Sequence, residues 1–272
     1  MAATKIQPIG VCRFSLVTEG GFKRGPSSVE ERAAYLFDDT RMAIRMAWFT
    51  HALMPSIRAQ TDQDFIFVVL ASSLMPQKWQ DQLAEAVSGC PAIRLDFVDP
   101  GKHYEICNGA FDRYTEPDAD VIAQFRLDDD DALARDYVQR VRADFDAFMA
   151  PLYQRFEMVS SDYTSGFILE ADGREAQLYR TFASTWTCAQ TLYLPPRSSK
   201  SLFVWGHHQL HCFMPTLTLN DKNMFLRGRH GTNDSDFKLP KHNTRPWDLG
   251  ALQRRFDIEL KPLQNALRAV SS

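Results

Sequence analysis

The chain has 272 residues, 44% of them hydrophobic, which is enough to bury a large core and to form an enzyme. Its 31 basic and 34 acidic residues give a net charge of −3 without a basic block, which argues against a nucleic-acid partner. The 5 cysteines are widely spaced and form no C-x-x-C pair, which argues against a disulfide framework or a zinc knuckle.

The sequence carries no recognisable targeting or membrane-spanning signal. Residues 1–8 contain no apolar stretch typical of secretion, and the longest apolar run, 65–71, is far shorter than a membrane span. We therefore expect a cytoplasmic protein without an integral membrane segment. The sequence does not indicate its oligomeric state.

The first half of the chain alternates predicted strands with predicted helices. Its apolar patterns place strands at 11–17, 64–71, 93–98 and 121–127, and helices at 39–53, 76–87 and 102–114. Ligands of open parallel sheets lie beyond the carboxyl ends of the strands. Thr18 and Glu19 after the first strand, and Ala71 at the end of the second, are therefore candidates to bind a nucleotide. An ordinary turn is the alternative for Thr18 and Glu19.

Four consecutive aspartates, 128–131, follow the strand 121–127 directly. Successive side chains of an extended chain alternate sides, so Asp128 and Asp130 point the same way. Two carboxylates about 4 Å apart repel by roughly 4 kcal/mol at an effective dielectric near 20, and Mg²⁺ or Mn²⁺ would relieve that repulsion. In the alternative interpretation Asp131 caps a helix that begins at residue 132, and the other aspartates are solvated.

The second half of the chain mixes short strands with helices. A helix is expected over 132–151, followed by strands at 157–162, 167–170, 176–182, 190–194 and 216–219. A second helix begins at His207, and a closing amphipathic helix over 247–270 is interrupted near Pro262. No change in composition forces a domain boundary.

An apolar strand ending in Asp-x-Asp, inside an α/β chain that continues with mixed strands, resembles the metal-binding motif of GT-A-fold glycosyltransferases. The stretches 14–23, 53–62, 126–133 and 230–235 are similar to those of the bacterial rhamnosyltransferase family. The resemblance implies an α/β GT-A-like fold for nucleotide-diphospho-sugar transfer. Its central, mostly parallel twisted sheet is flanked by helices, and a smaller antiparallel part lies in the second half. It also implies one domain over 1–272, with the donor bound by 1–131 and the acceptor side in 132–272.

The activity that this resemblance implies is metal-dependent glycosyl transfer. A sugar such as rhamnose would pass from a dTDP-, UDP- or GDP-linked donor to a glycan or glycolipid acceptor. In GT-A enzymes the Asp-x-Asp carboxylates hold the cation that bridges the two phosphates, which assigns Mn²⁺ or Mg²⁺ to Asp128 and Asp130. The cation would stabilise the negative charge on the leaving diphosphate. Arg126 either adds a fixed positive charge there or neutralises the acids.

A polar loop at 227–235 supplies a second group of candidates. By resemblance His230 completes the metal shell or contacts the diphosphate, although a surface histidine with a local hydrogen bond remains the alternative. Arg227, Arg229 and Asn233 are candidates to bind the phosphates, although loop arginines are often only solvated.

The catalytic base has several candidates. His207 and His208 follow Trp205-Gly206, where many inverting GT-A enzymes carry an acidic pair that deprotonates the acceptor hydroxyl. A histidine can do this near neutral pH, but a packed or capping histidine is the alternative. Asp234 is a carboxylate candidate, as are Asp162 and Asp236.

Two other functions fit part of the pattern. One is an Mg²⁺-dependent phosphohydrolase with Asp128 as the nucleophile, which is disfavoured because Ala132 stands where that class of enzyme carries Thr or Val. The other is a non-catalytic protein that binds a cation or a carbohydrate.

Overall fold

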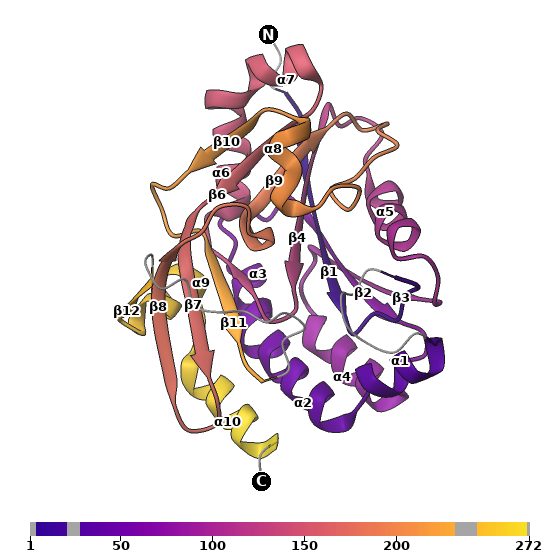
Figure 1. Ribbon diagram of the computed structural model, residues 1–272, viewed down its shortest axis with the longest axis vertical. Coiled ribbons are helices and arrows are strands. Elements are labelled where there is room, and N and C mark those ends of the chain that lie inside the picture. The colour runs from indigo at the N-terminus through magenta and orange to yellow at the C-terminus, as the bar shows by residue number, and fades with distance from the viewer. Residues whose placement is uncertain (1–3, 21–27, 232–243, 271–272) are drawn as a thin grey trace.

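The computed structural model of the protein describes residues 4–20, 28–231 and 244–270. Within these ranges the strands form a seven-stranded and a five-stranded sheet (Figure 1). The strands of the larger sheet are β1 (Ile6–Phe14), β2 (Ile66–Ser72), β3 (Ile93–Val98), β4 (Val121–Asp128), β6 (Val159–Tyr163), β9 (Gln190–Leu194) and β10 (Thr216–Leu219). Those of the smaller sheet are β5 (Ala132–Leu133), β7 (Ser165–Ala171), β8 (Ala176–Phe182), β11 (Phe225–Arg229) and β12 (Thr244–Trp247).

Helices connect and cover these strands. They are α1 (Val29–Leu36), α2 (Asp39–Trp48), α3 (Met54–Arg58), α4 (Gln77–Val87), α5 (His103–Tyr114), α6 (Tyr137–Asp144), α7 (Ala150–Phe156), α8 (Leu210–Phe213), α9 (Gly250–Phe256) and α10 (Leu260–Val270). π-Helical turns at Phe49–Leu53 and Phe145–Met149 join α2 to α3 and α6 to α7.

The order of strands in the larger sheet is β10-β6-β9-β4-β1-β2-β3. β1 pairs in parallel with β2 and β4, and β2 pairs in parallel with β3, whereas β9 is antiparallel to both of its neighbours. In the smaller sheet β8 runs antiparallel to β7 and β12. The predicted central, mostly parallel sheet with a smaller antiparallel part is confirmed. The carboxyl ends of β1, β2 and β4 consequently meet at one edge.

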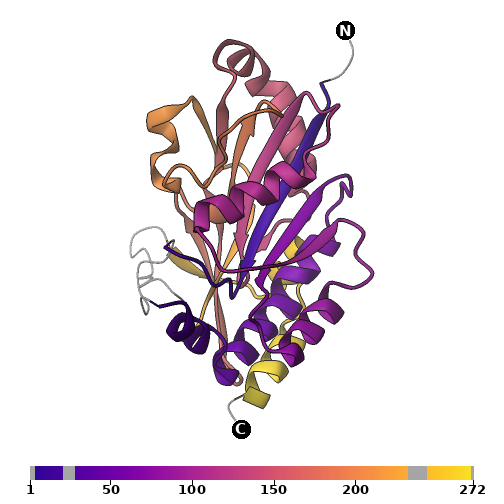
Figure 2. The ribbon, with the colours of Figure 1, turned by 90° about the vertical axis from the view of Figure 1, so that its right-hand side faces the viewer.

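Helices cover both faces of the larger sheet. In β2, Phe67 and Val69 pack in a core cluster with α2 and α4, whereas Val68 and Leu70 pack in a second cluster with α5. Figure 2 shows α5 lying across one face of this sheet. Because both faces of β2 are buried, its sequence is a continuous apolar run, as expected for a central parallel strand.

The helix predicted over 132–151 is wrong at its start. Residues 132 and 133 form β5, in which Leu133 pairs with Phe225 of β11, and α6 begins only at Tyr137. Asp131 therefore caps no helix, and its carboxylate instead accepts a hydrogen bond from the backbone N–H of Gly228 at 3.2 Å. Pairing with β11, which is distant in the sequence, overrides the local helical pattern.

The closing helix is also divided differently from the prediction. The break lies between α9 and α10, where Asp257 adopts a left-handed conformation with φ of 60°. Pro262 lies within the first turn of α10, where the missing N–H leaves no helical bond unmade.

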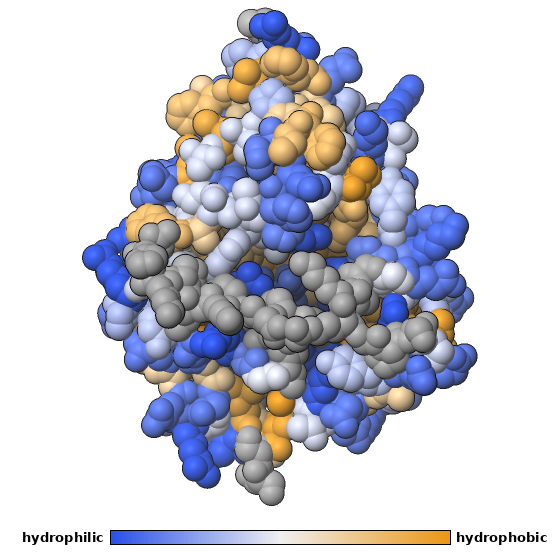
Figure 3. Space-filling model, viewed as in Figure 1, coloured by the Kyte–Doolittle hydropathy of each residue, from blue (hydrophilic) through white to orange (hydrophobic). Residues whose placement is uncertain are grey.

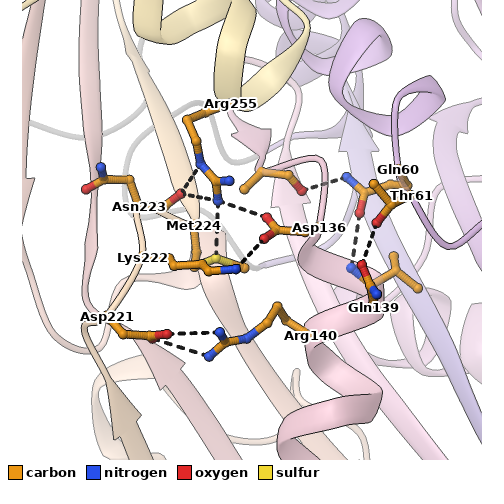
Figure 4. A network of polar contacts seen from close by, with 12 residues as sticks. Gln60, Thr61, Asp136, Gln139, Arg140, Asp221, Lys222, Asn223, Met224 and Arg255 are labelled. Carbon is orange, nitrogen blue, oxygen red and sulfur yellow. Dashed lines mark hydrogen bonds and ion pairs between the residues drawn. The ribbon is translucent and has the colours of Figure 1, made fainter.

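A polar network holds the segment after β4 against the segment before β11 (Figure 4). Asp136 accepts hydrogen bonds from Arg255 of α9 at 2.8 Å and from Lys222 at 3.1 Å. Arg255 also donates to the backbone carbonyl of Asn223 at 3.0 Å. Gln60 donates to the carbonyl of Ala134 at 2.9 Å, which ties the end of α3 to the same segment. These contacts fix how the acidic segment and β11 face each other.

Exposed apolar side chains gather at one end of the molecule, where Figure 1 places α7 and α8 and where Figure 3 shows apolar surface. They include Phe148, Phe156 and Phe213, which are 55%, 48% and 56% exposed. No helix in the described part of the chain is long and apolar enough to cross a membrane.

Candidate active site

Asp128 ends β4 beside Arg13 of β1, with which it is in register. Arg13 donates to a carboxylate oxygen of Asp128 at 3.2 Å, and its other terminal nitrogen lies 2.9 Å from Nε2 of His103. Burial lowers the pKa of His103 to about 4, with Arg13 and Arg126 acting in the same direction, so this imidazole is neutral and accepts the bond. Burial alone would raise the pKa of Asp128, but Arg13 and Arg126 hold it below its ordinary value. Asp128 is therefore an ionised, partly exposed carboxylate.

Arg126 lies on β4, with its guanidinium 5.5 Å from the ring centre of Phe203. Burial and the positive charge of Arg13 together lower its pKa to about 10, so Arg126 stays charged at neutral pH. Its Nε is buried and has no hydrogen-bond partner among residues 4–20, 28–231 and 244–270. An unmet buried donor of this kind costs free energy, and it is suited to an anionic ligand.

Asp129 and Asp130 meet Arg45 of α2 in the interior. Arg45 donates to both oxygens of Asp129, one of them at 2.9 Å, and lies 3.4 Å from Asp130. Asp129 is 0% exposed, and burial raises its pKa to about 7 in spite of Arg45. Burial would raise the pKa of Asp130 as well, but Arg45 and His230 lower it to about 2. Asp130 is consequently ionised.

His230 directly follows β11 and reaches Asp130 across 100 residues of sequence. Its Nε2 lies 3.0 Å from a carboxylate oxygen of Asp130, and its ring stacks on Trp48 with centroids 5.2 Å apart. A glycine is required two residues earlier, because a Cβ at position 228 would lie 2.3 Å from the carbonyl oxygen of Asp130. The structure thus brings together three of the predicted site residues, Asp128, Asp130 and His230, at the end of β4.

The prediction of a loop over 227–235 is wrong for its first three residues. Residues 227–229 belong to β11, where the guanidinium of Arg227 lies 5.0 Å from the ring centre of Trp186. Burial would lower the pKa of Arg227, but Asp131 and Asp128 raise it. Arg229 forms an ion pair with Glu170 of β7. Asn233, Asp234 and Asp236 lie outside the described residues.

The candidates after β1 and near the end of β2 make backbone and core contacts. The hydroxyl of Thr18 donates to the carbonyl of Gly20 at 3.0 Å, which is a turn contact. The N–H of Glu19 donates to the carbonyl of Gly101 at 2.8 Å. Ala71 is fully buried in the core cluster with α2 and α4.

His207 and His208 begin a 3₁₀ turn that leads into α8. Nδ1 of His207 lies 2.5 Å from the carbonyl oxygen of Thr185, whereas His208 is exposed. Asp162 is only 2% exposed and accepts the N–H of Thr185 at 2.7 Å. Its buried carboxylate therefore holds the backbone of Thr185 in place.

Arg13, Arg45 and Trp48 were not among the predicted site residues. Arg13 had a signal in the sequence, because it is a charged residue inside an apolar strand. Arg45 lies four residues after Arg41 in a helix whose neighbouring positions are apolar, so both arginines share a face. Which carboxylate Arg45 contacts depends on a contact across 84 residues of sequence, which no local pattern predicts.

The side chains at the end of β4 supply only part of the ligands that a divalent cation requires. Within residues 4–20, 28–231 and 244–270, no group of three or more His, Cys, Asp or Glu side chains could hold a metal ion. Mg²⁺, however, is usually bound by one or two carboxylates, with substrate phosphates and water as the other ligands. The two ionised carboxylates of Asp128 and Asp130 fit a cation that arrives with a phosphate-bearing substrate.

Comparisons with known proteins found a family and several structures with limited similarity. A family model described as "Putative rhamnosyl transferase" matches residues 7–242. No curated protein matches the sequence. The structure of S. aureus TarS 1-349 with UDP-GlcNAc has a TM-score of 0.44 at 11% identity, covering 87% of this chain and 62% of that chain. The complex of TarS 1-349 with UDP has a TM-score of 0.41 at 12% identity, covering 83% and 61%. The chain thus matches less than two thirds of these TarS chains.

A third match is 4-diphosphocytidyl-2C-methyl-D-erythritol synthase from Anaerococcus prevotii. Its TM-score is 0.34 at 9% identity, with 79% of this chain and 87% of that chain covered.

Proposed function

Since the chain belongs to the family described as putative rhamnosyl transferases and has a GT-A-like α/β fold, we propose that it transfers a sugar from a nucleotide-diphosphate donor to a hydroxyl acceptor. Rhamnose is the proposed sugar and a glycan or glycolipid the proposed acceptor. In this proposal residues 1–131 bind the donor and residues 132–272 form the acceptor side.

One observation carries the proposal, namely the juxtaposition of ionised carboxylates with fixed positive charges at the carboxyl end of the parallel strands. Asp128 and Asp130 are ionised, Arg126 has an unmet buried donor, and Arg227 is held near the carboxylates. A diphosphate with a divalent cation is complementary to such a set, because its oxygens can bind both the cation and the guanidinium groups.

The proposed roles follow from this charge pattern. Asp128 and Asp130 would hold Mn²⁺ or Mg²⁺, with His230 as a further ligand or as the group that orients Asp130. When bound, the cation supplies positive charge to the departing diphosphate. Arg126 and Arg227 would add fixed positive charge that needs no reorganisation during the reaction. Trp48 stacks on the ring of His230, and the burial of His230 and Asp130 strengthens their interaction.

Thermal unfolding tests the proposal without knowledge of the acceptor. UDP, GDP and dTDP are each added with and without Mn²⁺, and at least one is expected to raise the melting temperature by several degrees only when the metal is present. Asp128→Asn and Asp130→Asn should abolish that shift. Asp81→Asn, an exposed aspartate of α4, is the matched control and should retain it. A wild-type protein that no nucleoside diphosphate stabilises would contradict the proposed function.

A further inference from the structure

Thr185 adopts a backbone conformation that is unusual for its residue type. Its φ is +62°, a region that β-branched residues rarely enter and that is maintained only where surrounding contacts enforce it. Both sides of this residue are held. Its N–H donates to Asp162 at 2.7 Å, and its carbonyl oxygen lies 2.5 Å from Nδ1 of His207. The backbone of Thr185 thus connects a buried carboxylate to an imidazole ring.

This connection fixes the tautomer of His207. A carbonyl oxygen only accepts hydrogen bonds, so Nδ1 of His207 carries the proton and Nε2 presents a lone pair. Within the described part of the chain, Nε2 makes no hydrogen bond. Burial lowers the pKa of His207 although the Thr185 carbonyl opposes this, and the charges of Arg126, His208 and Arg227 lower it as well. The ring is therefore neutral at physiological pH.

His207 lies on the side of the acidic segment where the positive charges gather. His207 and Arg126 line one small cavity of about 10 Å³, together with Gln124 and Gln190. Arg126 stands two residues before Asp128 on β4, and the charge of Arg227 acts on both His207 and Asp128. His207 thus lies beside Arg126, one of the residues proposed to bind the diphosphate.

We propose that His207 is the base of the transfer reaction and that Asp162, acting through the Thr185 peptide, is its positioning residue. This inference rests on the proposed function. In the step, Nε2 of His207 takes the proton of the acceptor hydroxyl while the oxygen of that hydroxyl bonds to the anomeric carbon. The bond from that carbon to the diphosphate oxygen breaks, and its electron pair leaves with the nucleoside diphosphate. Asp162 acts in this proposal only through the hydrogen bond that it accepts from the Thr185 N–H.

The assay measures release of nucleoside diphosphate with water as the acceptor, from UDP-N-acetylglucosamine, dTDP-rhamnose and GDP-mannose. On the donor with the highest wild-type rate, His207→Ala is expected to lower kcat about 100-fold or more, as for loss of a general base. Stabilisation by the nucleoside diphosphate with Mn²⁺ should persist, which shows that the variant is folded. Added imidazole should restore part of the rate. His211→Ala, an exposed histidine of α8, is the matched control and should change the rate less than threefold.

Asp162→Ala, which removes the acceptor of the Thr185 N–H, tests the positioning role separately. It should lower kcat about tenfold at an unchanged KM for the donor, because His207 is present but less well held. A His207→Ala variant that binds the diphosphate and releases it at the wild-type rate would overturn the inference and leave the proposed function intact. A fall in rate that imidazole does not reverse would also overturn it, since that indicates a structural role. If the wild-type protein neither binds a nucleoside diphosphate nor releases one from any donor, the proposed function fails and the inference fails with it.

Discussion

At the scale of single residues, the carbonyl oxygen of Asp130 limits what can stand at position 228. A Cβ there would lie 2.3 Å from that oxygen and 3.0 Å from the ring of Trp48. Gly228→Ala should therefore push β11 away from the acidic segment, lower the free energy of unfolding by about 1–3 kcal/mol and weaken binding of nucleoside diphosphate with Mn²⁺. Denaturant unfolding and the thermal shift measure both effects.

Gly109→Ala is the control for that substitution. Gly109 lies within α5, and a Cβ at this position would meet no atom within 4 Å. Replacing a helical glycine by alanine should stabilise the protein by about 0.5–1 kcal/mol. Equal losses of stability in both variants would show that the close approach to Asp130 is not the cause.

Arg45 offers a second prediction at this scale, because it compensates a carboxylate that is 0% exposed. Arg45→Met leaves Asp129 buried without its charged partner and should cost about 3–5 kcal/mol of unfolding free energy. The double variant Arg45→Met/Asp129→Asn also removes the unpaired carboxylate of Asp129, and it should recover part of the lost unfolding free energy. A double variant no more stable than Arg45→Met would show that packing, rather than the ion pair, accounts for the loss.

Local patterns revealed some residues of the site and not others. The strand over 121–127 and its acidic end were predictable, because an apolar run and its termination are encoded within ten residues. The partners Arg13 and Arg45 were not, since each is an arginine whose carboxylate lies more than 80 residues away. Asp131 was misassigned for the same reason, because its partner, the N–H of Gly228, lies 97 residues downstream.

At the scale of elements, the network at Asp136 makes a prediction about pH. Burial would raise the pKa of Asp136, but Arg255 and Lys222 lower it below its ordinary value of 3.8. Its stabilising effect is therefore complete above the unfolded pKa, near 4, and is lost as the pH falls through the lower folded pKa. Asp136→Asn should reduce the free energy of unfolding at pH 7 by roughly 1–3 kcal/mol.

Denaturant unfolding from pH 7 to pH 3 measures this effect. The difference between wild type and Asp136→Asn should stay constant down to about pH 4 and then shrink. Asp146→Asn, at an exposed position in the adjoining helical turn, should differ from wild type by less than about 0.5 kcal/mol throughout. A difference for Asp136→Asn that is the same at pH 3 and pH 7 would contradict the assignment.

The elements themselves divide into those that local patterns determine and those that pairing determines. The helix α4 and the strand β9 match their predicted bounds to within a residue, because periodicity and flanking residues define them. β5 is only two residues long and exists through its pairing with β11, so the local sequence favoured a helix there instead. The π-helical turn at Phe49–Leu53 could not be predicted either, because the apolar periodicity of the helix continues through it.

At the scale of the whole molecule, the two halves of the chain share the larger sheet. β9, β6 and β10 from the second half extend the larger sheet beyond β4, and α10 packs against α2 of the first half. The smaller sheet lies wholly in the second half, but the larger sheet is incomplete in either half. We therefore expect the chain to unfold as one cooperative unit.

Tryptophan fluorescence tests this expectation, because the 5 tryptophans are divided between the halves, Trp48 and Trp79 in the first and Trp186, Trp205 and Trp247 in the second. One variant retains only the first pair and a second variant only the other three, with phenylalanine at the replaced positions. Each variant is unfolded in denaturant while its fluorescence and its far-ultraviolet circular dichroism are followed together. Within each variant, the fluorescence and the circular dichroism should have the same midpoint, because separation of β9 from β4 exposes the core around Trp48. A fluorescence transition of either half that precedes the loss of secondary structure would instead mean that residues 1–131 and residues 132–272 are separate folding units.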